Sequence, residues 1–271
     1  MKLNIVPART GAQWVREGMR VFLRQPLAFA GLFFMFLAAT AVAALLPVVG
    51  DALALALIPA VTVGLMAATQ QAVEGRFPMP AVLVVALRRS PSQTRAMLVL
   101  GGLYALALLL IIAISTWADD GQMARFVAKH GGRVTPEMMA DPEMQAAARA
   151  SMQQLMLAGL LYTPVAVLFW HAPALVHWHQ VPVGKSLFFS AVAVLRNTPA
   201  YLIYGLAWIA LTTVCSLALL LLAALVGRMG LAMSGMLPLS LMIAAMFYAS
   251  LWFTFRDSFS ADDAPAPPAA G

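Results

Sequence analysis

Six long apolar runs, none containing Asp, Glu, Lys or Arg, limit what this chain can fold into. They cover residues 27–48, 52–73, 96–117, 153–176, 200–226 and 231–254. A helix of about 20 apolar residues crosses the roughly 30 Å hydrocarbon core of a bilayer. The runs are too long for the strands of a membrane β-barrel and do not alternate as such strands do. We therefore predict an all-α fold, a polytopic transmembrane helical bundle with about six spans.

The composition agrees with a membrane location. Of the 271 residues, 62% are hydrophobic and only 10% are charged, whereas a soluble domain carries about 25% charged residues. The net charge of +6 is not gathered into a Lys/Arg-rich run, so we expect no nucleic-acid partner. The single cysteine, Cys215, can form neither an intrachain disulfide nor a thiolate cage for a metal. We expect no cofactor and no metal site.

The positive charges predict how the spans are oriented. Twelve of the 17 Lys and Arg residues fall on the side that also holds both termini: Lys2, Arg9, Arg16, Arg20, Arg24, Arg76, Arg88, Arg89, Arg95, Lys185, Arg196 and Arg256. Short loops rich in Lys and Arg stay in the cytoplasm. We therefore expect a multi-pass membrane protein whose N-terminus and C-terminus are both cytoplasmic. The basic stretch before the first run is too long for the start of a signal peptide.

The remaining segments give the domain plan. Residues 1–259 are expected to form a single transmembrane domain with one sizeable external loop at 118–151. Two helix starts lie in that loop, at Thr135-Pro136-Glu137 and at Asp141-Pro142-Glu143, since each combines a capping side chain with Pro and an acid. The second helix is expected to continue into the fourth span. Residues 260–271, rich in Ala and Pro, are expected to form a disordered tail.

A pattern that occurs three times suggests an internal repeat. Three segments end on Leu-Arg with Pro shortly after, at Leu23-Arg24-Gln25-Pro26, Leu87-Arg88-Arg89-Ser90-Pro91 and Leu195-Arg196-Asn197-Thr198-Pro199. Pro ends the incoming helix and can begin the next one. The second span after each segment also contains a Pro. We predict three parallel helix-hairpin repeats, approximately 8–75, 78–177 and 182–257, each opened by a cytoplasmic interfacial helix; chance recurrence in a Leu-rich sequence is the alternative.

The first interfacial helix is expected to be amphipathic. Arg16, Arg20 and Arg24 lie on one face, with Trp14 and Phe22 among the apolar residues opposite. Such a helix can bind the anionic cytoplasmic leaflet, so membrane lipid is the expected partner. Alternatively its apolar face packs on the protein's own spans, and the two are compatible. Arg88 and Arg196 are expected to reach the headgroups from the other two segments.

The candidate site residues gather at the cytoplasmic end of the fourth span. Three of the four histidines lie there, flanked by two tryptophans: Trp170, His171, His177, Trp178 and His179. Ionisable residues in spans are functional candidates. Three interpretations remain open: a structural cluster with Trp anchors, a contact to a ligand or lipid headgroup, and ligation of a metal or heme. The last is disfavoured because His171 and His179 are about two turns apart and no carboxylate or Cys completes a site.

Several stretches resemble a known family. They are 1–9, Gln25-Pro26-Leu27-Ala28, Gly75-Arg76-Phe77-Pro78-Met79-Pro80 and Phe169-Trp170-His171-Ala172-Pro173-Ala174-Leu175-Val176-His177-Trp178. They are similar to an uncharacterised family of multi-pass bacterial inner-membrane proteins, mostly from beta-proteobacteria. The resemblance implies a location and a topology class but no activity.

Three functions are weighed. No span contains Asp, Glu, Lys or Arg, which disfavours an ion-coupled pump, and neither a phosphate-binding Walker loop nor a His-Glu-x-x-His motif is present. We expect a non-enzymatic lipid- or partner-binding protein or scaffold. The alternative is a transporter or permease for a small or lipidic solute, and the third is a lipid-modifying enzyme using the histidines.

Glycines in the spans are expected to serve close helix packing: Gly31, Gly64, Gly101, Gly102, Gly159 and Gly205.

Overall fold

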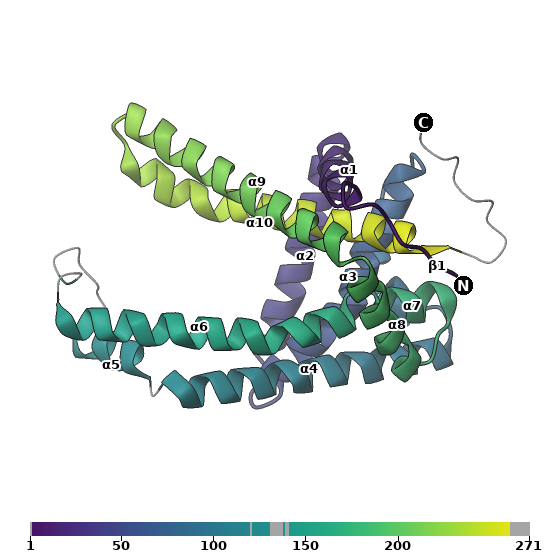
Figure 1. Ribbon diagram of the computed structural model, residues 1–271, viewed down its shortest axis with the longest axis horizontal. Helices are drawn as coiled ribbons and strands as arrows, with labels where there is room; N and C mark the ends of the chain where they lie inside the picture. Colours follow the sequence, from purple (N-terminus) through teal and green to yellow (C-terminus); the bar gives the residue numbers. More distant parts are fainter. Residues whose placement is uncertain (1, 120, 131–137, 139–140, 261–271) are drawn as a thin grey trace.

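The fold is almost entirely helical. The computed structural model describes residues 2–119, 121–130, 138 and 141–260. These residues form ten α-helices, one 3₁₀ helix and one two-stranded sheet (Figure 1). The prediction of an all-α helical bundle is therefore confirmed.

Six helices are long and apolar enough to cross a membrane, as predicted. They are α2 (Pro26–Ala44), α3 (Gly50–Val73), α4 (Pro91–Asp119), α6 (Pro142–Phe169), α9 (Thr198–Leu225) and α10 (Met229–Ser258). The helix start at Asp141 is also confirmed, because its carboxylate accepts a hydrogen bond of 2.7 Å from the Glu143 N–H and α6 runs without a break into the fourth span. The other predicted start, at Thr135, lies outside the described residues.

Short helices precede the odd-numbered spans. They are α1 (Thr10–Arg24), the 3₁₀ helix η1 (Pro80–Leu87) and α8 (Val183–Arg196). The second of them, η1, has eight residues and is not an α-helix. Its hydrogen bonds join residues three apart, and the last one runs from the Arg88 N–H to the Val85 carbonyl. Helices α5 (Gln122–Lys129) and α7 (Ala172–His179) complete the set. The order of short helix, span and span occurs three times, with α5 and α7 added in the second unit. That these units are three parallel helix-hairpin repeats stays a prediction.

The two ends of the described chain pair with each other. Strand β1 (Lys2–Leu3) lies antiparallel to β2 (Phe259–Ser260). An even number of spans requires that both ends lie on one side, and the sheet meets this requirement. Ser260 therefore belongs to a strand, and the rest of the predicted tail, residues 261–271, lies outside the described residues.

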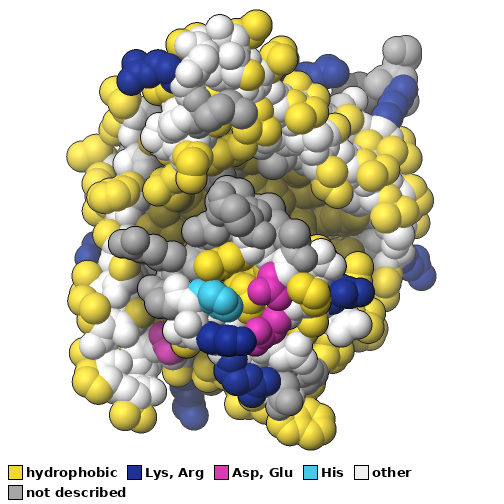
Figure 2. Space-filling model, turned by 90° about the vertical axis from the view of Figure 1, so that its left-hand side faces the viewer, with side chains coloured by type: hydrophobic (Ala, Val, Ile, Leu, Met, Phe, Trp, Pro, Cys, Tyr) yellow, Lys and Arg dark blue, Asp and Glu magenta, His cyan; other side chains and the backbone are white. Residues whose placement is uncertain are grey.

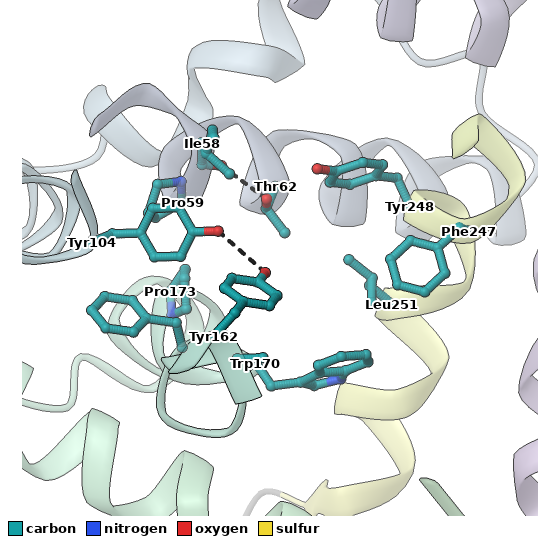
Figure 3. Close-up of a pocket in the computed structure, with 12 residues that line it drawn as sticks. Ile58, Pro59, Thr62, Tyr104, Tyr162, Trp170, Pro173, Phe247, Tyr248 and Leu251 are labelled. Carbon is teal, nitrogen blue, oxygen red and sulfur yellow. Dashed lines mark hydrogen bonds between the residues drawn. The ribbon is translucent and has the colours of Figure 1, made fainter. Parts of the chain in front are cut away.

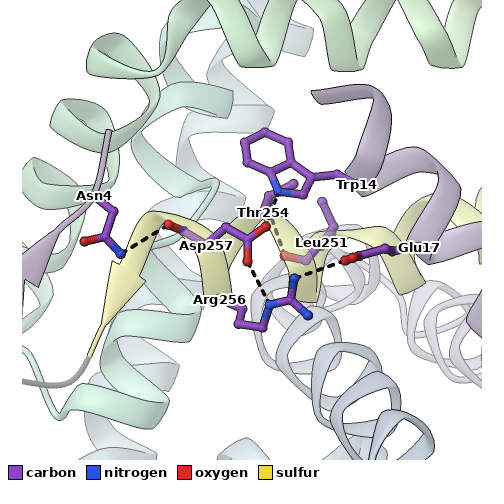
Figure 4. Close-up of polar contacts among 7 residues, drawn as sticks. All are labelled: Asn4, Trp14, Glu17, Leu251, Thr254, Arg256 and Asp257. Atoms are coloured by element: carbon purple, nitrogen blue, oxygen red, sulfur yellow. Dashed lines mark hydrogen bonds and ion pairs between the residues drawn. The ribbon is translucent and has the colours of Figure 1, made fainter. Parts of the chain in front are cut away.

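Helix α1 packs on the protein's own spans. Its Trp14 is fully buried, and the Trp14 indole N–H donates a hydrogen bond of 2.9 Å to the carboxylate of Asp257 at the end of α10 (Figure 4). Arg256 donates to Asp257 and, over 3.1 Å, to Glu17. Burial raises the pKa of Glu17, and the positive charge of Arg256 opposes this change. The apolar face of α1 is thus occupied by α9 and α10, while Arg16 and its neighbouring arginines stay exposed.

The long helices are arranged as hairpins that diverge. Helix α4 packs on α6, and α9 packs on α10, while α3 contacts α2, α4 and α10. In Figure 1 the α4–α6 and α9–α10 hairpins extend toward the same side and separate, whereas α7, α8 and the described chain ends lie at the opposite end. Figure 2 looks into the opening and shows a hollow lined by hydrophobic side chains between the two hairpins.

Candidate functional site

A pocket lies where the hairpins meet, between α3, α4, α6, α7 and α10 (Figure 3). Its volume is about 130 Å³. The walls are mainly aromatic and aliphatic: Ile58, Pro59, Thr62, Tyr104, Tyr162, Ala166, Phe169, Trp170, Pro173, Phe247, Tyr248 and Leu251. No Asp, Glu, Lys, Arg or His is among these residues, so the pocket suits an uncharged or amphiphilic group.

Three tyrosines supply most of the polarity of this pocket. The hydroxyl oxygens of Tyr104 on α4 and Tyr162 on α6 lie 3.4 Å apart. Figure 3 shows that the hydroxyl of Tyr248, from α10, is also directed into the space between the helices. The nearby hydroxyl of Thr62 donates instead to the Ile58 carbonyl, over 2.8 Å. Because a phenol can both donate and accept, the three tyrosine hydroxyls can bind an ester or other neutral oxygen.

A helix break places Trp170 in this pocket. Pro173 has no N–H to donate to the carbonyl of Phe169, and α6 ends at that residue. Pro173 then lies in the first turn of α7, which starts at Ala172. Across the break, Ser190 on α8 donates to the Val167 carbonyl and accepts from the His171 N–H, both over 2.9 Å. The serine hydroxyl thereby bridges the His171 N–H and the Val167 carbonyl, which would bond to each other in a continuous helix.

His171 faces away from the pocket and is fully buried. Its Nε2 lies 2.5 Å from the hydroxyl of Tyr201 on α9, and its ring packs against Phe255 and Phe259 with centroid distances of 5.9 and 5.4 Å. Its Nδ1 has no hydrogen-bond partner among the described residues. These contacts place His171 in the interface of α7, α9 and α10.

The other two histidines do not join His171 in a shared site. The ring of His179 lies 5.8 Å from Phe255, whereas the ring of His177 packs edge-on against Trp178 with a centroid distance of 4.8 Å. The His177 carbonyl accepts hydrogen bonds from Arg89 and Gln93, over 3.0 and 3.2 Å. Within the described ranges, no group of three or more His, Cys, Asp or Glu residues could hold a metal ion.

The two tryptophans attach this segment to α10. The Trp170 indole N–H donates to Thr254 over 3.3 Å. Trp178 packs against Trp252 and Phe255 with ring centroids 5.0 and 5.4 Å apart. Of the five predicted site residues, Trp170 alone lines the pocket. Trp170 thus forms part of the pocket wall, whereas the other four predicted site residues pack against neighbouring parts of the protein.

The predicted interfacial arginines are all exposed. This holds for each of Arg16, Arg20, Arg24, Arg88 and Arg196. In the part of the chain that the structure describes, none of these five forms an ion pair. Their exposure lets the guanidinium groups contact headgroups or water.

The pocket tyrosines were not identified from the sequence. A signal was present, because all five tyrosines of the chain lie inside the predicted spans. A phenolic hydroxyl in hydrocarbon needs a partner, so tyrosines on different spans tend to face one another. The sequence alone does not show that Tyr104, Tyr162 and Tyr248 share one pocket while Tyr201 and Tyr204 do not.

Comparison with known proteins places the chain beside a membrane protein. It is 39% identical over 269 residues to a probable inner membrane protein of Burkholderia thailandensis, and the match covers 98% of this chain and 97% of that protein. No protein-family model matches the chain, and no solved structure matches it.

Proposed function

The chain belongs to the same family as the probable inner membrane protein of Burkholderia thailandensis, and we propose that it is a non-enzymatic lipid-binding protein of the inner membrane. Its six apolar helices make it a multi-pass membrane protein. The lipid would enter sideways from the bilayer into the hollow between the α4–α6 and α9–α10 hairpins. Its polar ester region would lie against the tyrosine hydroxyls.

The proposal rests chiefly on the pocket at the base of the hollow. A soluble metabolite would be expected to meet charged or strongly polar recognition groups, whereas this pocket has aromatic walls and a few hydroxyls. The hollow above it is lined by hydrophobic side chains and lies between helices that span the bilayer (Figure 2). An acyl chain can occupy such a space without losing its apolar surroundings.

The orientation is part of the same proposal. We place both termini, α7 and α8 at the cytoplasmic face, with α5 and the turn between α9 and α10 on the outer side. The distribution of Lys and Arg supports this choice, and the exposure of Arg16, Arg20, Arg24 and Arg196 supports contact with anionic headgroups.

A non-enzymatic role is supported by where the histidines lie. The only candidate general bases proposed from the sequence were His171, His177 and His179, and none of them lines the pocket. The Nε2 of His171 is already engaged by the Tyr201 hydroxyl. A base must lie within hydrogen-bonding reach of the proton that it removes.

Filling the pocket tests the proposal. Ala166 lines the pocket, whereas Ala210 on α9 is exposed, so Ala166→Trp and Ala210→Trp are a matched pair. We expect native mass spectrometry of the detergent-purified wild-type protein and of Ala210→Trp to show a retained membrane lipid. We expect Ala166→Trp to lose it while keeping a wild-type melting temperature in detergent.

A second variant covers the chance that the large side chain disturbs folding. Tyr162→Phe removes one hydroxyl at almost constant volume, and we expect it to weaken retention of ester-linked phospholipid. Equal lipid retention by wild type, Ala166→Trp and Tyr162→Phe would contradict a lipid site in this pocket.

A further inference from the structure

We propose that Arg88, Arg89 and Arg95, at the start of α4, form a binding site for the phosphate group of an anionic phospholipid. We call these three residues, with Ser90 and Thr94, the α4 arginine site. It lies on the outer surface of the bundle, apart from the tyrosine pocket, and the inference does not depend on lipid binding there.

The site is a shallow depression with a volume of about 530 Å³. The three arginines, Ser90 and Thr94 line it, and Leu98 continues it along α4. All three arginines are exposed. The depression is large enough for a phosphate with its glycerol, and it is open to the surroundings on the side away from the protein.

The positive charge in this site is not balanced by nearby carboxylates. The sequence contains no Asp or Glu from residue 75 to residue 117. The ion pairs within the described residues use carboxylates at Glu17, Glu74, Glu143 and Asp257, none of which pairs with the site. Three like charges within eight residues repel one another, and a bound anion removes that repulsion. A guanidinium also matches the geometry of a phosphate, because it can donate two parallel hydrogen bonds.

Hydrogen bonds hold the site in place before a ligand arrives. Arg89 donates to the His177 carbonyl over 3.0 Å through one of its five N–H groups, which anchors it to α7. Ser90 accepts from the Gln93 N–H over 3.3 Å and so caps α4. Thr94 donates to the carbonyls of Leu87 and Ser90, both over 3.0 Å, which fixes the turn from η1 into α4. The partial positive charge of the helix start adds to the field of the arginines.

The apolar surface below the site identifies a lipid as the source of the phosphate. Leu98, Leu106 and Leu110 lie along one side of α4 and are 62%, 55% and 53% exposed. Between them lies Gly102, where an added Cβ would meet nothing within 4 Å. A chain of exposed leucines with a gap at the glycine is a surface along which an acyl chain can lie in the membrane. A free phosphate has no apolar part that could contact this surface.

Lipid titration tests this inference on the full-length protein in neutral detergent. The double variant Arg88→Gln/Arg95→Gln removes two charges from the site and keeps Arg89, which contacts α7. The matched control Arg9→Gln/Lys185→Gln removes two exposed charges that lie outside the α4 arginine site. We expect the affinity for phosphatidylglycerol to fall about tenfold or more in the double variant, with little change in the control. Phosphatidylcholine binding should not distinguish the variants.

Competition identifies the source of the phosphate. Millimolar inorganic phosphate should not displace phosphatidylglycerol, because it lacks the acyl chains that contact α4. Displacement by inorganic phosphate at such concentrations would overturn the assignment to a lipid. An equal loss of affinity in the Arg9→Gln/Lys185→Gln control would overturn the site itself, because binding would then follow net charge alone.

Two further variants keep the outcome clear. A second double variant is used if Arg88→Gln/Arg95→Gln melts at a lower temperature than the wild type. Arg88→Lys/Arg95→Lys keeps both charges but removes the planar guanidinium groups, so we expect weaker phosphatidylglycerol binding. Unchanged phosphatidylglycerol binding by this variant would count against the site. Ala166→Trp should bind phosphatidylglycerol at the α4 arginine site as the wild type does. Failure of the tyrosine pocket and failure of the arginine site are therefore distinguishable.

Discussion

At the scale of single residues, buried polar side chains join segments that are far apart in the sequence. Asn197 is 1% exposed and lies between α8 and α9. Its side chain accepts from the Val6 N–H over 2.8 Å and donates to the Asn4 carbonyl over 3.0 Å. It thus fixes the N-terminal segment, whose Asn4 also donates to the Asp257 carbonyl (Figure 4). The third of the segments that end on Leu-Arg, Leu195–Pro199, therefore holds the N-terminal segment in place as well as ending a helix.

Replacing Asn197 by Ala should destabilise the protein. The change leaves the Val6 N–H and the Asn4 carbonyl without their partner, and an unsatisfied buried polar group costs about 1–3 kcal/mol. We expect a lower melting temperature in detergent for Asn197→Ala. The neighbouring Leu195 is 66% exposed, so Leu195→Ala is the matched control and should melt as the wild type does. Equal melting temperatures of all three proteins would show that the N-terminal segment is not held by Asn197.

At the scale of helices, close packing depends on a few glycines. The prediction is confirmed for Gly64, where an added Cβ would lie 2.6 Å from the Leu83 Cα, and for Gly101, which approaches the Ala56 backbone. It is wrong for the remaining four, which have nothing within 4 Å of an added Cβ: Gly31, Gly102, Gly159 and Gly205. Gly18 on α1 was not predicted, yet an added Cβ there would lie 2.5 Å from the Ser250 Cβ. Which glycines matter depends on the partner helix, and a single sequence does not give the partner.

Two Gly→Ala substitutions should separate packing from helix propensity. Gly18→Ala forces α1 away from α10, and overpacking of this kind costs about 1–3 kcal/mol. Gly205→Ala on α9 meets open space, so it should be neutral or stabilise the helix by up to about 1 kcal/mol. Thermal unfolding in detergent measures both changes. A destabilised Gly205→Ala together with a neutral Gly18→Ala would contradict the packing of α1 on α10.

Much of the helical architecture was predictable because length and hydropathy decide it. The six spans follow from the uncharged runs, and the start of α6 follows from Asp141 and Pro142. The 3₁₀ geometry of η1 and the helix α5 were not predicted. The fourth apolar run continues to residue 176, whereas α6 ends at Phe169. This break was not predicted, because the hydroxyl of Ser190 that bridges it comes from another helix.

At the scale of the whole molecule, the arrangement of the hairpins creates the candidate sites. The tyrosine pocket takes side chains from four long helices and α7, and the α4 arginine site combines the turn after η1 with a contact to α7. Apolar periodicity could not predict either combination, since every face of these helices is hydrophobic. The arginines themselves were partly predicted: Arg88 was identified as interfacial, whereas Arg89 and Arg95 were not proposed as site residues.

The orientation of the hairpins is the claim on which both sites depend, because it assigns each site to a leaflet. Cysteine labelling in spheroplasts tests it most directly. In a Cys215→Ala background, the exposed positions Arg9 and Val226 are replaced by Cys one at a time and treated with a membrane-impermeant maleimide. We predict that Val226→Cys is labelled in intact spheroplasts and that Arg9→Cys is labelled only after the membrane is opened. Labelling of Arg9→Cys in intact spheroplasts would contradict the account.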